Sequence, residues 1–257
     1  MEKEEFQRLI DVVDRLLSKD GCSWDRAQTL SSLRGFVLEE ALELIDALDR
    51  RKIEDIEEEL GDILYHIILI SRLTERRDSL KRIIRGITEK LIKRHPHIFK
   101  NKKDKKPDEV VRDWEKIKIK EKNGKSIGYG LCSTFPALLS AFKLGVRSMS
   151  YNFDWDDIEQ VFEKLEEEIG ELKAELRRRR KNQKAIEYEV GDILFVVANI
   201  ARHLNVNPEV ALMKTNKKFI RRFDEMCRLM KKEKRDIHHL EIDELESYWR
   251  RAKQISD

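Results

Sequence analysis

Residues 59–70 of this chain read ELGDILYHIILI, and residues 189–200 read EVGDILFVVANI. In each stretch, a Glu and an Asp three positions apart run directly into an almost wholly apolar segment. A helix that is apolar on most sides lies inside a helix bundle, so the acidic side chains at its start are expected to point toward the bundle interior. The sequence therefore predicts an all-α protein with carboxylates among its packed helices.

A second acidic block precedes each of these stretches. Residues 39–43 read EEALE and residues 167–171 read EEIGE, which both follow the pattern EExxE. Residues 44–58 separate the two acidic blocks in the first copy, and residues 172–188 separate them in the second. Positions three and four apart share a helix face, so each block presents its carboxylates as one cluster. Two neighbouring helices would gather four or five carboxylates at one point, twice in the chain.

Either acidic block alone is typical of many solvent-exposed helices, and only the recurrence of the whole arrangement indicates a function. Uncompensated negative charge is costly in a folded interior unless a cation sits among it. Asp and Glu without accompanying His or Cys favour a hard ion. We therefore expect Mg²⁺ as the cofactor, with Mn²⁺ as a substitute.

A di-iron carboxylate bundle is the nearest chemical alternative. Such sites use Glu-x-x-His pairs, and no His stands three residues after any of these acids. His66 lies four residues after Asp62, but Val196 holds the equivalent position in the second copy. We interpret His66 as a core histidine rather than a metal ligand.

The composition agrees with a helical protein of the cytoplasm. Charged residues make up 40% of the 257 residues with a net charge of only +3, and four prolines and ten glycines are few. Cys22, Cys132 and Cys227 form no CxxC motif, which indicates free thiols in a reducing compartment. The chain opens on charged residues rather than a signal peptide. Its apolar runs fall short of the roughly twenty residues that cross a bilayer, so no membrane partner is expected.

Glu59 and Glu189 are 130 positions apart, and other residues recur at a similar separation. We predict two tandem domains, residues 1–122 and 132–257, joined by a glycine-containing linker at 123–131. Each domain is predicted to be a four-helix bundle followed by a short tail helix. The recurring pairs are Trp24-Asp25 with Trp155-Asp156, Lys90 and Arg94 with Lys218 and Arg222, and Trp114 and Lys118 with Trp249 and Lys253.

The recurring basic pairs indicate a substrate with a phosphate chain. Lys90 and Arg94, like Lys218 and Arg222, are spaced i, i+4 on one helix face, so both members of a pair could reach one polyphosphate. Such a pair is otherwise typical of a solvated stripe, and its recurrence favours a site. A metal ion would bridge phosphate oxygens, while a spare carboxylate orients the attacking water.

With both acidic patterns present twice on an all-α chain, the sequence resembles the tandem form of the MazG nucleoside triphosphate pyrophosphohydrolase family over essentially its whole length. The segments GCSWD at 21–25, KRHPHIF at 93–99 and EVGDILF at 189–195 are similar to characteristic segments of that family. A single acidic motif would not separate this family from dimeric dUTPases or phosphoribosyl-ATP pyrophosphohydrolases. The two-domain match is specific, and it implies two tandem MazG-like bundles.

The resemblance implies Mg²⁺-dependent hydrolysis of a nucleoside triphosphate to the monophosphate and pyrophosphate, in a homodimer. It also implies broad base specificity and a role in nucleotide housecleaning or alarmone control. The implied metal ligands are Glu40, Glu43, Glu59 and Asp62, and in the second copy Glu168, Glu171, Glu189 and Asp192. Glu39 and Glu167 would help to position the water. The remaining residues implied for activity are Lys218, Arg222, Trp249 and Lys253, with the first-copy equivalents Lys90, Arg94, Trp114 and Lys118.

Asn199 lies one helical turn after Phe195, on the face that we expect to be buried. Two interpretations stay open: Asn199 contacts the nucleobase, or it is a buried amide bonded to backbone. The first copy has Leu69 at this position. This difference, and the family's concentration of activity in the C-terminal half, favour the second site as the active one.

A helical nucleic-acid-binding protein or a scaffold is the alternative from another class. Basic stretches at 177–181 and 231–235 suggest it. The near-neutral net charge argues against a broad phosphate footprint, and an Arg run suits a helix C-terminus. A scaffold would explain neither the acidic repeat nor the Lys/Trp repeat. We therefore expect nucleoside triphosphates, and not nucleic acid, as partners.

Overall fold

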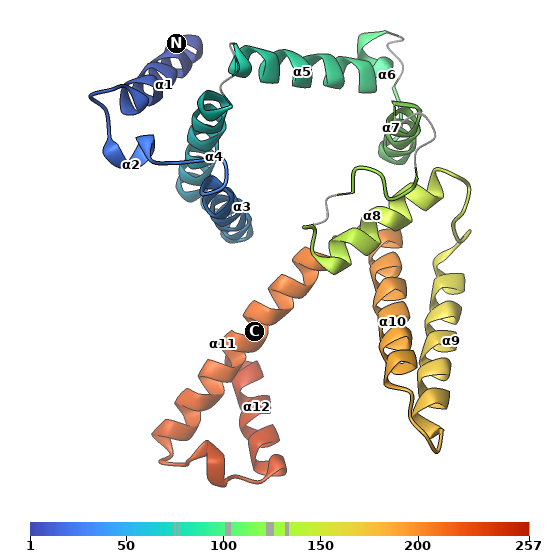
Figure 1. The fold of residues 1–257 in the computed structure, drawn as a ribbon. Coiled ribbons are helices and arrows are strands. Elements are labelled where there is room, and N and C mark those ends of the chain that lie inside the picture. The colour runs from blue at the N-terminus through green and yellow to red at the C-terminus, as the bar shows by residue number, and fades with distance from the viewer. Residues whose placement is uncertain (75, 77, 101–103, 122–125, 132–133, 257) are drawn as a thin grey trace. The chain divides into compact units, whose positions relative to one another are not determined.

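The computed structural model describes residues 1–74, 76, 78–100, 104–121, 126–131 and 134–256, and every regular element in these ranges is a helix (Figure 1). The predicted all-α class is confirmed. The chain divides into two compact units, Met1–Asp104 and Lys105–Asp257. Within the described ranges, no helix combines the length and the apolar character that a membrane span needs.

Unit 1 is built around an antiparallel helical hairpin formed by α3 and α4, and α1 and α5 both pack on α4. Arg51 ends α3 in the left-handed conformation, with φ of 57°, and turns the chain directly into α4. The helices of unit 1 are α1 (Glu2–Leu17), α2 (Ser23–Arg26), α3 (Leu33–Arg50), α4 (Ile53–Leu73), α5 (Ser79–Arg94) and α6 (Pro96–Phe99).

The core of unit 1 lies along α4, where the sequence places the apolar run. Ile68 and Leu69 are fully buried and pack with Val13 of α1, Leu33 of α3 and Leu80 of α5. Arg72, near the end of α4, donates two hydrogen bonds to Asp14 of α1, from Nε at 2.6 Å and from Nη2 at 3.0 Å. The packed apolar surface and this paired contact hold α1 against the hairpin.

Unit 2 repeats the plan of unit 1, with the largest difference in length at α11, which has 25 residues against the 16 of α5. The hairpin of α9 and α10 corresponds to that of α3 and α4, and α8 packs on α10 as α1 packs on α4. The helices of unit 2 are α7 (Pro107–Glu121), α8 (Ala137–Met149), α9 (Ile158–Arg177), α10 (Gln183–His203), α11 (Pro208–Lys232) and α12 (Ile242–Ser256), with a 3₁₀ turn η1 (Ile237–His239) before α12.

Side-chain caps start three helices of unit 2 where the sequence places a cap residue. Asp157 accepts a hydrogen bond from the Gln160 backbone N–H at 3.0 Å at the start of α9. Asn182 begins α10, and Asn207 begins α11 directly before Pro208, with its side chain accepting from two backbone N–H groups. Such caps satisfy donors that the first helical turn leaves unpaired.

A second hairpin, formed by α11 and α12, follows α10 in the chain. Met226, Leu229 and Met230 of α11 pack with Tyr248 and Ala252 of α12 in a small core of their own. The order of α8, α9, α10, α11 and α12 in the second half thus matches that of α1, α3, α4, α5 and α7 in the first.

The predicted linker at 123–131 includes residues outside the described ranges, as does Cys132, so the domain limits 1–122 and 132–257 stay predictions. The compact units divide earlier, before α7. Cys22 and Cys227 are free thiols.

An ion pair between the buried Arg202 and the partly buried Asp154 joins α10 to the loop before α9. The Arg202 Nη1 donates to Asp154 Oδ2 at 2.9 Å, and its Nε donates to Asn199 Oδ1 at 3.1 Å. Gly145 of α8 lies against this pair, with no room for a side chain. Because a buried charge is costly without a partner, this arrangement fixes how α8 packs on α10.

We expect the Gly145→Ala variant to lose about 1–3 kcal/mol of stability, because close-packed interiors resist added volume. The new Cβ would lie 2.3 Å from Asn199 Oδ1 and 2.8 Å from Arg202 Nε. The matched control is Gly170→Ala in α9, where an added Cβ meets no heavy atom within 4 Å, and it should gain up to about 1 kcal/mol. Chemical denaturation followed by circular dichroism measures both, and equal effects would contradict the expectation.

Candidate metal centres

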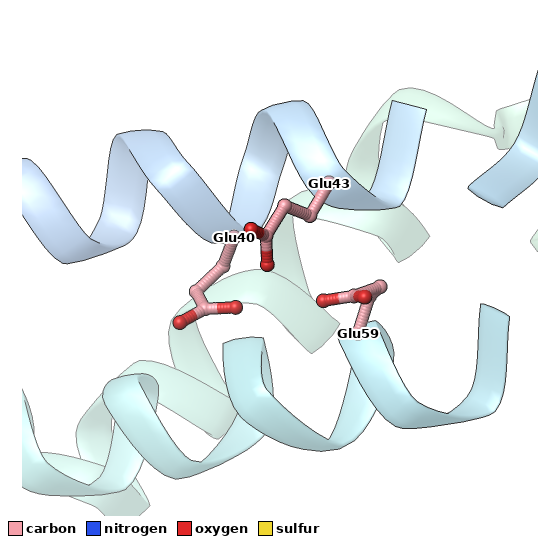
Figure 2. Close-up of side chains that lie close together, drawn as sticks. All are labelled: Glu40, Glu43 and Glu59. Carbon is pink, nitrogen blue, oxygen red and sulfur yellow. The ribbon is translucent and has the colours of Figure 1, made fainter. Parts of the chain in front are cut away.

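Three carboxylates of unit 1 converge between α3 and α4. One oxygen each of Glu40, Glu43 and Glu59 lies within 4.8 Å of the others. Figure 2 shows Glu40 and Glu43 from α3 and Glu59 from α4 pointing into the space between the two helices. Glu40 and Glu43 share one face of α3 because they are three positions apart, and the antiparallel hairpin brings Glu59 opposite them. We call these residues the first cluster.

The hairpin of unit 2 gathers a related set, which we call the second cluster, in which Glu168 and Glu189 are the equivalents of Glu40 and Glu59. One oxygen each of Glu168 on α9 and of Glu189 and Asp192 on α10 lies within 4.8 Å of the others. Glu168 is buried, with 6% of its surface exposed. In both units, two adjacent helices of one hairpin therefore supply the carboxylates, as the sequence predicts.

The fourth predicted ligand of each set lies beside the cluster rather than within it. The charge of Glu171 acts on Glu189, and the charge of Asp62 acts on Glu59. Glu39 and Glu167, the first residues of the two EExxE patterns, are exposed.

The carboxylates of each cluster repel one another, and desolvation together with this repulsion raises the pKa of one member of each cluster. Desolvation is the largest cause that raises the pKa of Glu59, and the negative charges of Glu43 and Glu40 raise it further. The pKa of Glu189 is raised in the same way, first by desolvation and then by the charge of Glu171. A divalent cation would relieve this repulsion, and an all-oxygen donor set fits Mg²⁺. The residues therefore fit the expected metal.

The two hairpins coincide with two matches to one family model. Residues 28–99 and 157–238 match the MazG nucleotide pyrophosphohydrolase domain. Each matched segment contains one complete acidic cluster and the whole of the basic helix that follows it, α5 or α11. The chain belongs to the MazG family.

Full-length similarity to other MazG-family proteins runs through both halves. Over 253 residues the chain is 38% identical to the nucleoside triphosphate pyrophosphohydrolase/pyrophosphatase MazG of Thermotoga maritima, which covers 96% of this chain and 95% of that protein. It is 34% identical over 256 residues to the nucleoside triphosphate pyrophosphohydrolase of Escherichia coli strain K12, with 97% of each chain covered. It is also 35% identical over 254 residues to the uncharacterized protein YabN of Bacillus subtilis, across 52% of that protein.

The basic and aromatic residues expected for MazG activity lie on other helices than the acids. In unit 2 the Trp249 ring of α12 lies 5.1 Å from the Phe219 ring of α11, next in sequence to Lys218. Arg222 of α11 and Lys253 of α12 belong to the same hairpin. Their convergence with the second cluster on one substrate stays a prediction.

The first-half equivalents are distributed over two helices. Lys90 and Arg94 lie on α5, and Trp114 and Lys118 lie on α7. The Lys118 ammonium is 5.0 Å from the centre of the Trp114 ring, which is a cation–π contact between residues one helical turn apart.

Asn199 adopts the second of its two predicted arrangements. It is 1% exposed, its Nδ2 donates to the Phe195 carbonyl oxygen at 3.1 Å, and its Oδ1 accepts from Arg202. It is thus a buried amide bonded to its own helix, and a contact with a nucleobase stays a prediction.

Two neighbours of the clusters make contacts that the sequence analysis did not predict. Lys164 forms ion pairs with Glu167 and Glu168, with Nζ to oxygen distances of 2.9 and 2.8 Å. Its spacing of three and four from these acids was a visible signal. His66 is buried, as expected of a core histidine, but its Nε2 lies 3.4 Å from Glu40 Oε1.

The raised pKa values predict how the metal-free protein responds to pH. In the window just above the reference value of 4.5, the folded chain keeps a proton on Glu59 or Glu189 that the unfolded chain has released. These groups therefore lower the free energy of unfolding as pH rises through that window. The Glu189→Gln variant lacks this contribution, so in EDTA it should lose less stability between pH 4.5 and neutrality than the wild type.

Thermal unfolding in EDTA and in Mg²⁺ measures this effect. Mg²⁺ at about 100 times its dissociation constant should stabilise the wild type by about 2.7 kcal/mol and the variant by less. Glu166→Gln, an exposed acid of α9 outside the cluster, serves as the matched control. The same pH slope in all three proteins, with no shift on adding Mg²⁺, would refute the repulsion between the clustered acids.

Proposed function

We propose that this MazG-family protein hydrolyses nucleoside triphosphates to nucleoside monophosphate and pyrophosphate, with Mg²⁺ bound at the carboxylate clusters. The observation that carries the proposal is that each hairpin gathers carboxylates from both of its helices, with Glu40 and Glu59 in the first and their equivalents Glu168 and Glu189 in the second. The names of the relatives from Thermotoga maritima and Escherichia coli support the same reaction class.

The second cluster is proposed as the main reaction site. Glu168, Glu189 and Asp192 would hold the cation, and the neighbouring carboxylate of Glu171 would add negative charge to the site. When bound, the cation supplies charge stabilisation on the phosphate oxygens. Glu167, exposed at the edge of the cluster, would accept a hydrogen bond from the attacking water and direct it toward phosphorus.

Basic side chains would hold the rest of the phosphate chain. Lys218 and Arg222 lie four positions apart on α11, so one triphosphate could contact both. The packing of Trp249 on Phe219 fixes α12 against α11 and carries Lys253 with it. Recognition through the phosphates rather than the base is the basis for proposing broad base specificity, and with it a housecleaning or alarmone-controlling role.

A homodimer in the cytoplasm completes the proposal. Large apolar side chains are exposed on the basic helices of both units, including Ile84 and Ile87 of α5 and Phe219 and Ile220 of α11. Apolar faces of this kind are typical of surfaces that a partner covers, and a second copy of the chain is the partner that we propose.

The basic stretches give no support to nucleic-acid binding. Arg177 ends α9, Arg178 follows it, and Arg178 forms an ion pair with Glu175 at 2.9 Å. Lys231 and Lys232 form the last turn of α11. Cations at helix C-termini interact favourably with the helix dipole. These stretches are thereby accounted for within the fold.

Pyrophosphate release from a panel of nucleoside triphosphates, with Mg²⁺ or EDTA, tests the proposal. The double variant Glu168→Gln with Glu189→Gln should lose about 100-fold or more in kcat/KM, because two oxygen ligands of the cation become neutral amides. Glu166→Gln serves again as the control and should retain wild-type turnover. Release of orthophosphate in place of pyrophosphate, or full activity of the double variant, would refute the proposal.

The same assay compares the two halves. Glu40→Gln with Glu43→Gln should lower turnover less than the second-cluster pair does, because the second site is proposed as the main reaction site. Circular dichroism must show that both pairs remain folded.

A further inference from the structure

The two clusters differ in what contacts the second Glu of their EExxE pattern. Alignment of the patterns places Phe36 where the second half has Lys164, and His66 where it has Val196. Glu40 therefore lies against an imidazole that comes from the opposite helix, α4. Glu168 instead forms an ion pair with a lysine of its own helix, α9. The residue that contacts this Glu thus differs between the two halves in its side chain and in the helix that carries it.

His66 is held firmly beside the first cluster. It is 6% exposed, and the Phe36 ring stacks on it with centroids 6.1 Å apart and planes 14° apart. The Tyr65 ring lies 5.1 Å away on the same helix, and its hydroxyl is fixed by donating to Asp25 Oδ1 at 2.6 Å. Aromatic packing therefore directs the Nε2 edge of His66 toward Glu40.

The other nitrogen of this ring is unpartnered. His66 Nδ1 is buried and has no hydrogen-bond partner in the structure. A buried polar atom without a partner is costly, and such atoms in folded proteins call for an explanation beyond packing. A phenylalanine or valine would fill the same place without this cost. The presence of an imidazole here, in place of an apolar side chain, points to a role for its Nε2 edge at Glu40.

Lys164 places a full positive charge at the second cluster. Its Nζ lies 2.8 Å from Glu168 Oε1 and 2.9 Å from Glu167 Oε1, and these contacts raise the pKa of the ammonium. A cation that binds Glu168 must compete with this ammonium. In the first cluster the equivalent residue is Phe36, which offers no competing charge.

We propose that the first cluster binds a divalent cation by itself, with His66 positioning Glu40, whereas the second cluster binds its cation tightly only together with a polyphosphate. A metal–triphosphate complex brings both a cation for Glu168 and anionic oxygens for the displaced Lys164. His66 is thus a positioning residue. The inference rests on the proposed function, because it assigns a resident metal to one half and a substrate-borne metal to the other.

Equilibrium binding of Mn²⁺ to the full chain tests this without an activity measurement. The electron paramagnetic resonance signal of free Mn²⁺ reports the unbound ion. Without nucleotide, we expect a tight and a weak class of site. Glu40→Gln with Glu43→Gln should abolish the tight class, and Glu168→Gln with Glu189→Gln the weak one. Addition of α,β-methylene-ATP, whose α–β bridge resists hydrolysis, should tighten the weak class alone.

Single variants then test His66 and Lys164 one at a time. His66→Val, which installs the residue of the second half, should weaken the tight class by about 10- to 100-fold, the usual effect of removing a residue that orients a metal ligand. His66→Gln should recover part of the loss, since its amide can donate to Glu40. Lys164→Met should tighten the weak class by about tenfold, because it removes the ammonium that competes with the cation for Glu168. Lys173→Met, an exposed lysine of α9, is the control and should change neither class.

Three outcomes would overturn the inference. These are Mn²⁺ sites of equal affinity, an unchanged tight class in folded His66→Val, or an unchanged weak class in Lys164→Met. If His66→Val fails to fold, the partly exposed Lys164 decides the question by itself. Equal affinities would leave the proposed hydrolysis standing, whereas a complete lack of Mn²⁺ binding would remove the metal role from the proposed function as well.

Discussion

Each acid-bearing hairpin holds several carboxylates close together against their mutual repulsion. The packing of the other helices on the hairpin keeps them in place. The acids of ExxD stand in the first half of α4 and α10, and the same helices continue into fully buried side chains of their units, including Ile68, Leu69 and Ala198. Burial of this apolar surface stabilises the packed helices, so the helices that carry the carboxylates cannot separate without opening the core. A cation that binds among the carboxylates relieves their mutual repulsion, and this relief adds to the free energy of metal binding.

Both halves tie the acid-bearing hairpin to the chain segment before it by a similar device, an arginine–aspartate pair. An arginine ten residues after the Asp of ExxD, Arg72 or Arg202, donates hydrogen bonds to an Asp of the preceding segment, Asp14 or Asp154. The device is exposed in the first half and buried in the second, where Asn199 and Gly145 complete it. Two domains of common plan have thus diverged in their surroundings while keeping the central arrangement.

The sequence predicted the helices, the tandem plan and the two groups of acids, because helical periodicity decides which residues share a face. It could not decide which three oxygens converge, since Asp62 and Glu171 have the correct spacing and still lie beside the clusters. The contacts of His66 depend on how α4 meets α3, which only packing determines. Lys164 was predictable from its spacing to Glu168, but solvent-exposed helices carry the same spacing of charges.

The two acid-bearing hairpins turn in different ways. Residues 51–52 join α3 to α4, whereas residues 178–182 join α9 to α10, and the carboxylates still meet in both. The alignment of the acids is therefore set by the faces of the helices and not by the bend between them. The connection between the two helices of a hairpin can become longer or shorter without moving the clustered carboxylates. Insertions in these connections should therefore be the most readily tolerated.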